Sequence, residues 1–305
     1  MSIDIACGEL AFVDLTFPGL ESLPAAGEER HAGDFLRSAG GGAITAIGAA
    51  RLGLSSALAS PISADAEGDF LRATLAAEGV RWAGRTVART AVTAVLPADG
   101  DRAMATFDPG EQLTAAELAA VEPRAVVVSL PRLRLAPPGA LLYATVSDAD
   151  ARAVAEGVAF AGVDRARVLL VNEREALLMS GAADAGDAAR RLAELAPRVV
   201  VTRGPWGAIE LAGGELYEAR ALPFRAVDTT GAGDLFTAAY AWADLSGAGP
   251  LERLRWAVVY ASLSVRVSTA VAGAVTLDVL FEEGARHGLE RPAWHRSVAI
   301  EEEAR

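Results

Sequence analysis

The segment from 227 to 245, VDTTGAGDLFTAAYAWADL, contains the residue types best suited to chemistry. Gly231, Ala232 and Gly233 stand before Asp234, which opens an apolar run of helical character. Small residues at a helix start let backbone N–H groups turn toward one point, where the positive end of the helix dipole stabilises an anion. Such a turn can hold an oxyanion or a transferring phosphoryl group, and Asp234 could accept a proton from a hydroxyl beside it. The alternative is an ordinary Asp N-cap after a Gly-rich turn, and the segment alone favours neither.

The rest of the sequence predicts the elements that position this turn. Three short runs are nearly all apolar, as in strands buried on both faces of a parallel sheet, at 125–130, 166–171 and 198–202. Amphipathic helical runs occur at 148–161, 173–179 and 184–195. The alternation predicts βαβ units, and therefore a mainly parallel sheet between two layers of helices.

Two stretches interrupt this alternation. Residues 10–36 contain Pro and Gly with little helical period, and residues 86–107 have the pattern of two strands joined by a turn at Asp99-Gly100. We expect both stretches to form a small accessory sheet that covers the substrate as a lid. The chain 1–305 is then one domain with lid segments at about 10–36 and 86–107. An exposed apolar face of this lid would favour a homodimer.

The composition excludes several kinds of chemistry. All 28 basic residues are Arg, because the sequence contains no Lys. A P-loop, a protein-kinase strand lysine and a Schiff-base lysine are therefore excluded. The single Cys7 excludes an internal disulfide and a Cys-cluster zinc site, and the 3 His residues are too few and too scattered to suggest a metal site.

The charge balance bears on partners and compartment. A net charge of −12 repels phosphate backbones and acidic membrane surfaces, so neither nucleic acid nor a membrane is an expected partner. No uncharged stretch is long enough to span a bilayer. The N-terminal segment carries Asp4 and Glu9 where a signal peptide would have a basic start. A soluble, cytoplasmic protein is expected.

Four motifs together resemble a known family. The segment 228–236, DTTGAGDLF, resembles the C-terminal signature of the phosphofructokinase B, or ribokinase-like, family of sugar and nucleoside kinases. The glycines at 40–42 and the run that follows them resemble its N-terminal signature. Residues 171–175 resemble its N-x-x-E motif, and 202–207 its T-x-G-x-x-G loop. The resemblance spans about 3–277 and implies a three-layer α/β/α sandwich with a mainly parallel sheet and a small β-sheet lid.

The resemblance implies roles at the reacting centre. Asp234 would be the catalytic base, and Gly231, Ala232 and Gly233 the anion hole. Substrate-binding residues would be Asp14, Gly40, Gly41 and Gly42. Taken alone, Asp14 is also a common loop residue, and the glycines also fit a turn before a helix.

The resemblance also implies a nucleotide and cation site. ATP would be bound by Asn172, Thr202, Gly204 and Gly207. Glu175, one helical turn from Asn172, would help hold magnesium through water. Asp228 and Thr230 match positions that support a monovalent cation, which we expect to be potassium. Local alternatives are a helix cap with its first-turn acid for Asn172 and Glu175, and a strand followed by a tight turn for the loop at 202–207.

Three departures from the family pattern concern the substrates. Ile44 followed by Thr45 stands where an Asn is usual, and residues 145–152 lack an Asp-x-Asn-x-Arg segment. Tyr260 stands where an adenine-side Asn is common.

Arg132 and Arg134 could reach a phosphate from the end of a strand, although a solvated loop is favoured. Three of the five tryptophans, at 206, 242 and 256, are interpreted as packing residues.

These observations predict a magnesium-dependent kinase that transfers the γ-phosphoryl group of ATP to a hydroxyl of a sugar or related small polyol. A nucleoside kinase of the same family is one alternative. A catalytically silent nucleotide- or sugar-binding regulatory protein is another, although a regulator would not need the G-A-G-D segment. A dinucleotide-binding dehydrogenase is excluded, because no G-x-G-x-x-G follows the first strand.

Overall fold

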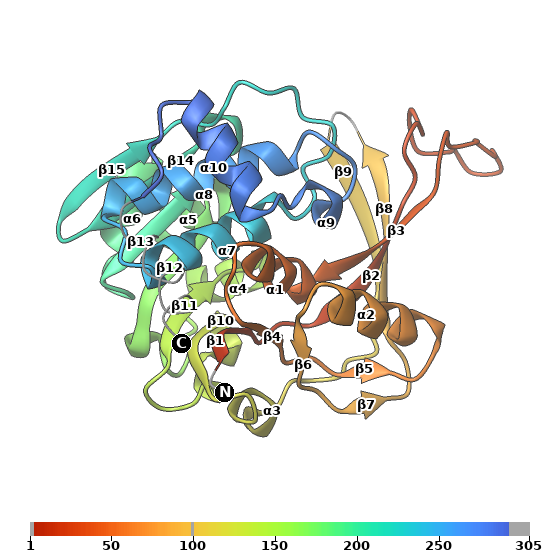
Figure 1. Cartoon of the computed structure of the whole chain (residues 1–305), viewed down its shortest axis with the longest axis horizontal. Helices are drawn as coiled ribbons and strands as arrows, with labels where there is room; N and C mark the ends of the chain where they lie inside the picture. Colours follow the sequence, from red (N-terminus) through yellow and green to blue (C-terminus); the bar gives the residue numbers. More distant parts are fainter. Residues whose placement is uncertain (1–2, 99–100, 293–305) are drawn as a thin grey trace, which may run out of the picture.

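A nine-stranded sheet runs through the centre of the molecule (Figure 1). The computed structural model describes residues 3–98 and 101–292. In order across the sheet, the strands are β15 (Glu215–Ala219), β14 (Ala208–Ala212), β13 (Arg198–Thr202), β12 (Ala166–Asn172), β11 (Leu141–Thr145), β10 (Pro123–Ser129), β1 (Ile3–Cys7), β4 (Ser56–Leu58) and β6 (Arg81–Trp82). The strands from β13 to β6 are parallel, and at one edge β14 pairs antiparallel with both β13 and β15.

Helices cover both faces of this sheet, as the βαβ pattern predicts. One face carries α1 (Gly42–Arg51), α2 (Ala66–Ala77), α7 (Ala232–Leu245), α8 (Pro250–Ser264), α9 (Ala270–Gly273) and α10 (Leu277–Arg286). The other carries α3 (Ala115–Ala119), α4 (Asp148–Ala155), α5 (Glu173–Ser180) and α6 (Ala185–Leu192). Strand β10 shows why its residues are nearly all apolar: Ala125 and Val127 enter one core, whereas Val126 and Val128 enter the other.

The element boundaries agree closely with the sequence patterns. Strand β13 spans the predicted residues, and β10 and β12 differ from their predicted runs by one or two residues. Helix α4 ends at Ala155, before the predicted end at 161. Gly157 follows with a φ of 88°, a conformation that side-chain-bearing residues rarely adopt, so the chain turns there.

The accessory sheet is separate from the main sheet. Its order is β3 (Leu36–Gly41), β2 (Ala11–Thr16), β8 (Ala91–Ala98) and β9 (Asp101–Phe107). It packs beside α1, α2 and α9. Thr86 and Val87 lie outside this sheet, because they form β7, which pairs with β5 (Ile62–Ser63). The predicted turn at Asp99-Gly100 lies outside the described residues.

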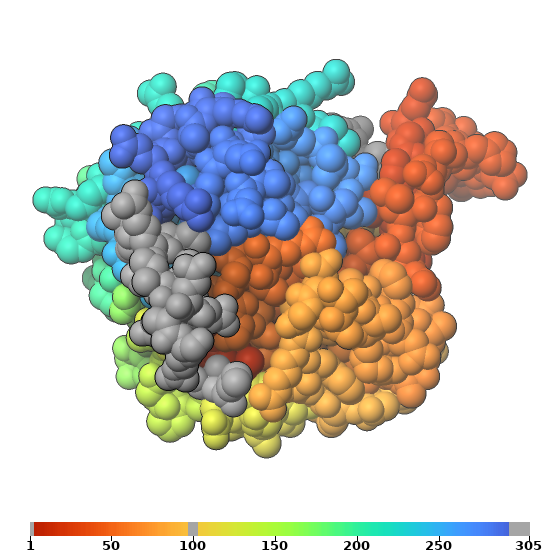
Figure 2. Space-filling view, viewed as in Figure 1, coloured from red at the N-terminus to blue at the C-terminus, as the bar shows by residue number. Residues whose placement is uncertain are grey.

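The connection between β2 and β3 projects from the rest of the molecule, as the red-orange segment in Figure 2 shows. Within 3–98 and 101–292, no helix has the length and apolar character needed to cross a membrane. The predicted three-layer fold with a small β-sheet is confirmed.

Candidate active site

Helix α7 begins at a left-handed turn made by Gly231. Its φ is 71°, and a Cβ there would lie 2.4 Å from the Cβ of Ala270 and 2.8 Å from Cδ1 of Ile44. Conformation and space therefore both require glycine. At Gly233 a Cβ would meet no atom within 4 Å, so the turn is open on that side. This is the geometry that an anion at a helix N-terminus needs.

Asp234 occupies the third position of α7, and the N-cap is Gly231. The interpretation of Asp234 as an ordinary N-cap is therefore wrong. Burial raises the pKa of Asp234 to about 7; a hydrogen bond from Thr45 opposes this rise, whereas the Glu9 and Asp14 carboxylates add to it. A carboxylate whose pKa lies near neutral pH is suited to general base catalysis.

Asp14 lies in β2 against the backbone of β3. A Cβ on Gly40 would come 2.2 Å from Oδ2 of Asp14, so only glycine allows this approach. Burial and the Asp228 carboxylate together raise the pKa of Asp14 to about 6. The fold thus brings the small sheet to the start of α7, where Asp14 also acts electrostatically on Asp234.

Gly41 and Gly42 join the small sheet to α1. Gly41 has a φ of 58°, and a Cβ there would lie 2.4 Å from the carbonyl oxygen of Leu10. A Cβ on Gly42 would lie 2.7 Å from the carbonyl oxygen of Glu9. These glycines bring α1, and with it Thr45, up to the start of α7. The predicted substrate residues and the predicted base therefore converge on one region.

Asp228 ties together two loops beside this region. Its Oδ1 accepts a hydrogen bond from the N–H of Thr230 at 2.8 Å, and its Oδ2 accepts one from the N–H of Thr269 at 2.9 Å. The hydroxyl oxygen of Thr230 is buried and has no hydrogen-bond partner within the described chain. A buried oxygen without a partner fits a position near a cation.

Asn172 and Glu175 form a capping box at the start of α5. Asn172 Oδ1 accepts a hydrogen bond from the Glu175 N–H at 2.8 Å, and Glu175 Oε2 accepts one from the Asn172 N–H at 3.0 Å. The structure therefore contains the helix cap and first-turn acid that the sequence offered as the alternative to a nucleotide and magnesium site. Burial raises the pKa of Glu175, and the hydrogen bonds from Asn172 oppose that rise.

Magnesium would need ligands beyond this pair. Among the residues that the structure describes, no group of three or more His, Cys, Asp or Glu side chains could hold a metal ion. Magnesium usually keeps several waters and binds substrate phosphates through one or two carboxylates. Asn172 and Glu175 supply one amide oxygen and one carboxylate, a donor set that fits a magnesium ion whose other ligands are nucleotide phosphates and water.

The loop after β13 is a tight turn that leads into β14. Gly204 opens a short 3-10 segment, and the N–H of Arg203 donates to the carbonyl oxygen of Gly207 at 2.7 Å. Gly207 has a φ of 91°, and a Cβ there would lie 2.0 Å from the carbonyl oxygen of Ala219. Thr202 ends β13 and pairs with Ala208. The local alternative of a strand and tight turn is thus also part of the structure.

Two of the three tryptophans pack as predicted, and one does not. Trp242 and Trp256 are buried in the core. Trp206, in the turn after β13, is 68% exposed, so its interpretation as a packing residue is wrong. Its ring stands free beside the glycines of the predicted nucleotide loop.

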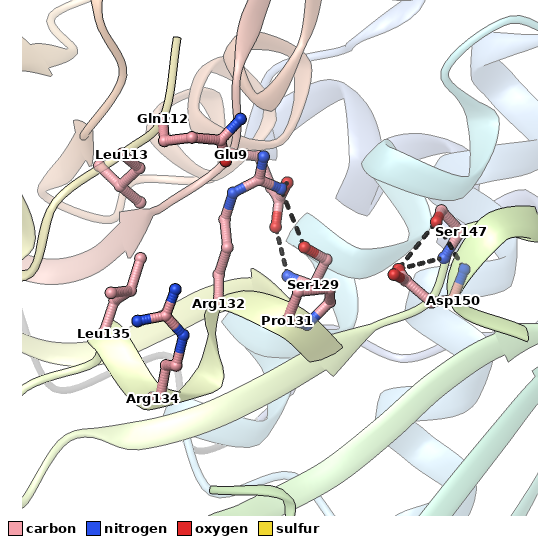
Figure 3. Close-up of a pocket in the computed structure, with 10 residues that line it drawn as sticks. All are labelled: Glu9, Gln112, Leu113, Ser129, Pro131, Arg132, Arg134, Leu135, Ser147 and Asp150. Carbon is pink, nitrogen blue, oxygen red and sulfur yellow. Dashed lines mark hydrogen bonds and ion pairs between the residues drawn. The ribbon is translucent and has the colours of Figure 1, made fainter. Parts of the chain in front are cut away.

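Glu9 and Arg132 form an ion pair that the sequence analysis missed. Glu9 accepts hydrogen bonds from the Arg132 guanidinium and from the N–H of Ser129. The Arg132 side chain is only 19% exposed, so the solvated loop favoured for it is wrong. Both residues line a cavity of about 370 Å³ (Figure 3). No sequence motif contains Glu9. Its position two residues after a buried strand was the one feature that could have indicated a functional residue.

The departures at 44 and 260 are packing features. Ile44 is 2% exposed and packs on Gly231, whereas the next residue, Thr45, reaches the Asp234 carboxylate. The Tyr260 hydroxyl donates to the carbonyl oxygen of Val275 at 3.1 Å within the core. Neither Ile44 nor Tyr260 therefore lines an open site.

Residues 1–276 match the model of the family described as pfkB family carbohydrate kinase. The chain belongs to this family. Membership agrees with the resemblance drawn from the four motifs.

Solved structures support the same fold. An Arabidopsis thaliana ribokinase complexed with ribose and ATP has a TM-score of 0.74 and 22% identity, over 93% of this chain and 99% of that one. A putative ribokinase II from E. coli, in complex with ATP and Mg²⁺, has a TM-score of 0.77 and 20% identity, over 94% of this chain and 100% of that one. The ribokinase-like fold that the motifs imply is therefore confirmed.

One curated relative is a nucleoside kinase. A cytidine kinase from Thermococcus kodakarensis is 42% identical over 94 residues. The match covers 30% of this pfkB-family chain and 33% of the relative, so it spans about a third of either protein.

Proposed function

We propose that the protein transfers the γ-phosphoryl group of ATP to a hydroxyl of a sugar or related small polyol. The observation that carries this proposal is the position of Asp234. Its pKa of about 7 and its place at the open N-terminal turn of α7 support a role as proton acceptor beside a transferring phosphoryl group.

In this mechanism Asp234 accepts the proton of the acceptor hydroxyl as its oxygen attacks the γ-phosphorus. A phosphate ester forms and ADP leaves with the electron pair of the broken P–O bond. Backbone N–H groups at Gly231, Ala232 and Gly233 stabilise the charge on the transferring group. Asp14 accepts hydrogen bonds from other hydroxyls of the acceptor. The glycines at 40–42 let the acceptor approach the backbone closely.

The nucleotide lies on the other side of the phosphoryl group in this proposal. Thr202, Gly204 and Gly207 line it, and Asn172 assists near the phosphates. Glu175 helps to hold magnesium through water. When bound, magnesium neutralises charge on the phosphate oxygens. Trp206 offers an exposed ring on which a base could stack.

A monovalent cation, potassium, completes the proposed site. Asp228 and Thr230 hold it beside the N-terminal turn of α7. The buried Thr230 hydroxyl without a hydrogen-bond partner in the described chain supports this placement. The ion would strengthen the positive field at the turn without contacting the acceptor.

The whole chain acts as one kinase domain in this proposal, with lid segments at about 10–36 and 86–107. Three large apolar side chains of these segments are exposed: Phe35 by 54%, Met104 by 60% and Phe107 by 46%. An exposed apolar surface of this kind favours a partner, so a homodimer through the lid is part of the proposal.

A nucleoside acceptor is the second candidate. The stretch of 94 residues that is 42% identical to the cytidine kinase supports it. The discriminating measurement is ATP consumption with magnesium over a panel of neutral sugars, sugar acids, sugar phosphates and nucleosides. Turnover with cytidine above that with every sugar would replace the sugar proposal. ATP binding without turnover on any member would favour the silent regulator.

A further inference from the structure

The cavity lined by Glu9 and Arg132 has no role in the reaction as proposed above. It lies where β1, β10 and β11 end (Figure 3). Glu9 follows β1, Ser129 ends β10, and Arg132 and Arg134 come from the 3-10 segment that follows (Leu130–Leu135). Asp150 comes from the first turn of α4. The lining therefore gathers two guanidinium groups and two carboxylates around one space.

The two carboxylates already have hydrogen-bond donors. One Glu9 oxygen accepts from the N–H of Ser129, and the other accepts from Arg132. Asp150 Oδ2 accepts from the N–H of Ser147 at 3.0 Å and from its hydroxyl at 2.8 Å, which caps α4. These acceptors are occupied by the protein itself.

Arg132 Nη1 donates to Glu9 and to the Ser129 hydroxyl, but other donors of the cavity are unused. Arg132 Nε is buried and has no hydrogen-bond partner within 3–98 and 101–292. The guanidinium of Arg134 is exposed, and no hydrogen bond or ion pair joins it to another described residue. A guanidinium carries five N–H donors and no acceptor, and its fork matches a carboxylate or phosphate. The unused capacity therefore calls for an anionic oxygen group.

One lining residue of the cavity, Glu9, links it to the reacting centre. The Glu9 backbone packs on Gly42, the first residue of α1, and α1 carries the Thr45 that contacts Asp234. The charge of Glu9 also acts on Asp234. A small acceptor with its hydroxyl at Asp234 could therefore extend toward the end of β10. An anion in the cavity would also be held close to the transferring group.

We infer that this cavity binds an anionic group of the acceptor, a carboxylate or a phosphate, so that the acceptor is a sugar acid or a sugar phosphate. The inference rests on the proposed function and narrows it. Arg134 supplies the free donors, and Arg132, held by Glu9, supplies Nε. Neutral sugars would leave these donors facing water.

The test compares anionic acceptors with the neutral sugars that share their carbon skeleton: gluconate with glucose, ribonate with ribose, and fructose 6-phosphate with fructose. Binding is measured by calorimetry in the presence of a non-hydrolysable ATP analogue, and kcat/KM by ADP release. Arg134→Gln removes the charge at the exposed lining residue. Arg190→Gln is the matched control, because Arg190 is a 59% exposed side chain on α6 outside the cavity.

We expect the wild type to prefer one anionic member over its neutral partner. Arg134→Gln should reduce that preference about tenfold or more, in binding and in kcat/KM, as befits a charge-assisted hydrogen bond. Arg190→Gln should keep the preference. If binding shows the preference but no member is phosphorylated, the proposed function fails and the inference on the cavity stands.

Three results would overturn the inference. One is a wild type that prefers no anionic acceptor. A second is an Arg134→Gln variant in which only the KM for ATP rises, since the cavity would then serve the nucleotide. A third is Arg134-dependent binding of inorganic phosphate with no preference among acceptors, since the anion would then be separate from the acceptor.

Discussion

The hydroxyl of Thr45 donates a hydrogen bond to the Asp234 carboxylate, with 3.3 Å between Oγ1 and Oδ1. Thr45 lies in α1 and Asp234 in α7, and the two helices pack against each other. This bond lowers the pKa of Asp234, against the larger effect of burial. Thr45 is therefore a positioning residue that lowers the pH at which the proposed base becomes ionised.

Thr45→Val should shift the pH profile of the reaction upward. With the pKa of Asp234 at about 7, the wild-type kcat/KM should fall tenfold per unit as pH decreases below that value, because the protonated carboxyl cannot accept a proton. Removal of the hydroxyl raises this pKa, so the acidic limb moves to higher pH. The measurement is kcat/KM from pH 5 to 9, and an unmoved limb would contradict the role given to Thr45.

Asp234→Asn should abolish proton acceptance while preserving the fold. Turnover on the best acceptor should fall by at least ~10²-fold, the lower end for a general base. The increase in melting temperature caused by ATP and magnesium should persist, because the side chain keeps its size and shape. Turnover close to that of the wild type would show that another group is the base.

Gly233→Ala and Gly231→Ala form a matched pair at the turn. A methyl at Gly233 enters open space, so stability should stay equal or rise by about 0.5–1 kcal/mol while turnover falls through obstruction of the phosphoryl site. A methyl at Gly231 meets Ala270 and Ile44 at a φ of 71°, so this variant should be clearly less stable. Urea unfolding and kcat are the measurements. Unchanged turnover in Gly233→Ala would place the phosphoryl group elsewhere.

Turnover should be faster in potassium than in sodium at equal ionic strength if Asp228 and Thr230 hold the proposed cation. Thr230→Val removes the hydroxyl oxygen that is buried without a hydrogen-bond partner in the described chain, and it should abolish the difference between the two salts. Initial rates at saturating ATP provide the measurement. Equal wild-type rates in both salts would remove the reason for this site.

Asp244→Asn should destabilise the protein by about 3–5 kcal/mol, because it breaks a buried ionic network and leaves guanidinium groups unpaired. Asp244 is 6% exposed and bonds Arg167 at 2.7 Å, Arg198 at 2.6 Å and the Tyr143 hydroxyl at 2.6 Å. Burial alone would raise the pKa of Asp244, but the hydrogen bonds and charges of these partners outweigh burial and lower the pKa to about 2.

Urea unfolding at pH 7 measures this loss, and Asp187→Asn is the control. Asp187 is 57% exposed and pairs with one exposed Arg, so its loss should cost at most about 1 kcal/mol. Since the folded pKa of Asp244 lies below the unfolded value, its stabilisation is complete above about pH 4 and is lost as pH falls toward 2. Equal losses in both variants would contradict the importance of burial.

The sequence by itself determined the elements and the reacting turn. Apolar runs such as 166–171 predict strands because both faces of a central parallel strand are buried. The glycines around Asp234 predict the tight turn at the start of α7, because φ is a local property; the contacts that limit the space at Gly231 come from the distant Ile44 and Ala270. Both kinds of signal act within a few residues, so they survive in a single sequence. They also place strands β2, β8 and β9 of the small sheet, but not β3 (Leu36–Gly41), which lies almost wholly after the predicted segment 10–36.

Only the tertiary structure decided which side chains meet. Thr45 bonds Asp234 and Glu9 pairs with Arg132, and in both cases the two residues come from different elements. Asp228 also acts electrostatically on Asp14, which lies in another element. A hydrophobic pattern reports that a residue faces the core, but not which element lies opposite. The exposure of Trp206 was also set by its tight turn, since hydrophobicity alone predicts burial. Contacts between distant segments depend on how whole layers pack, and packing is a property of the assembled fold.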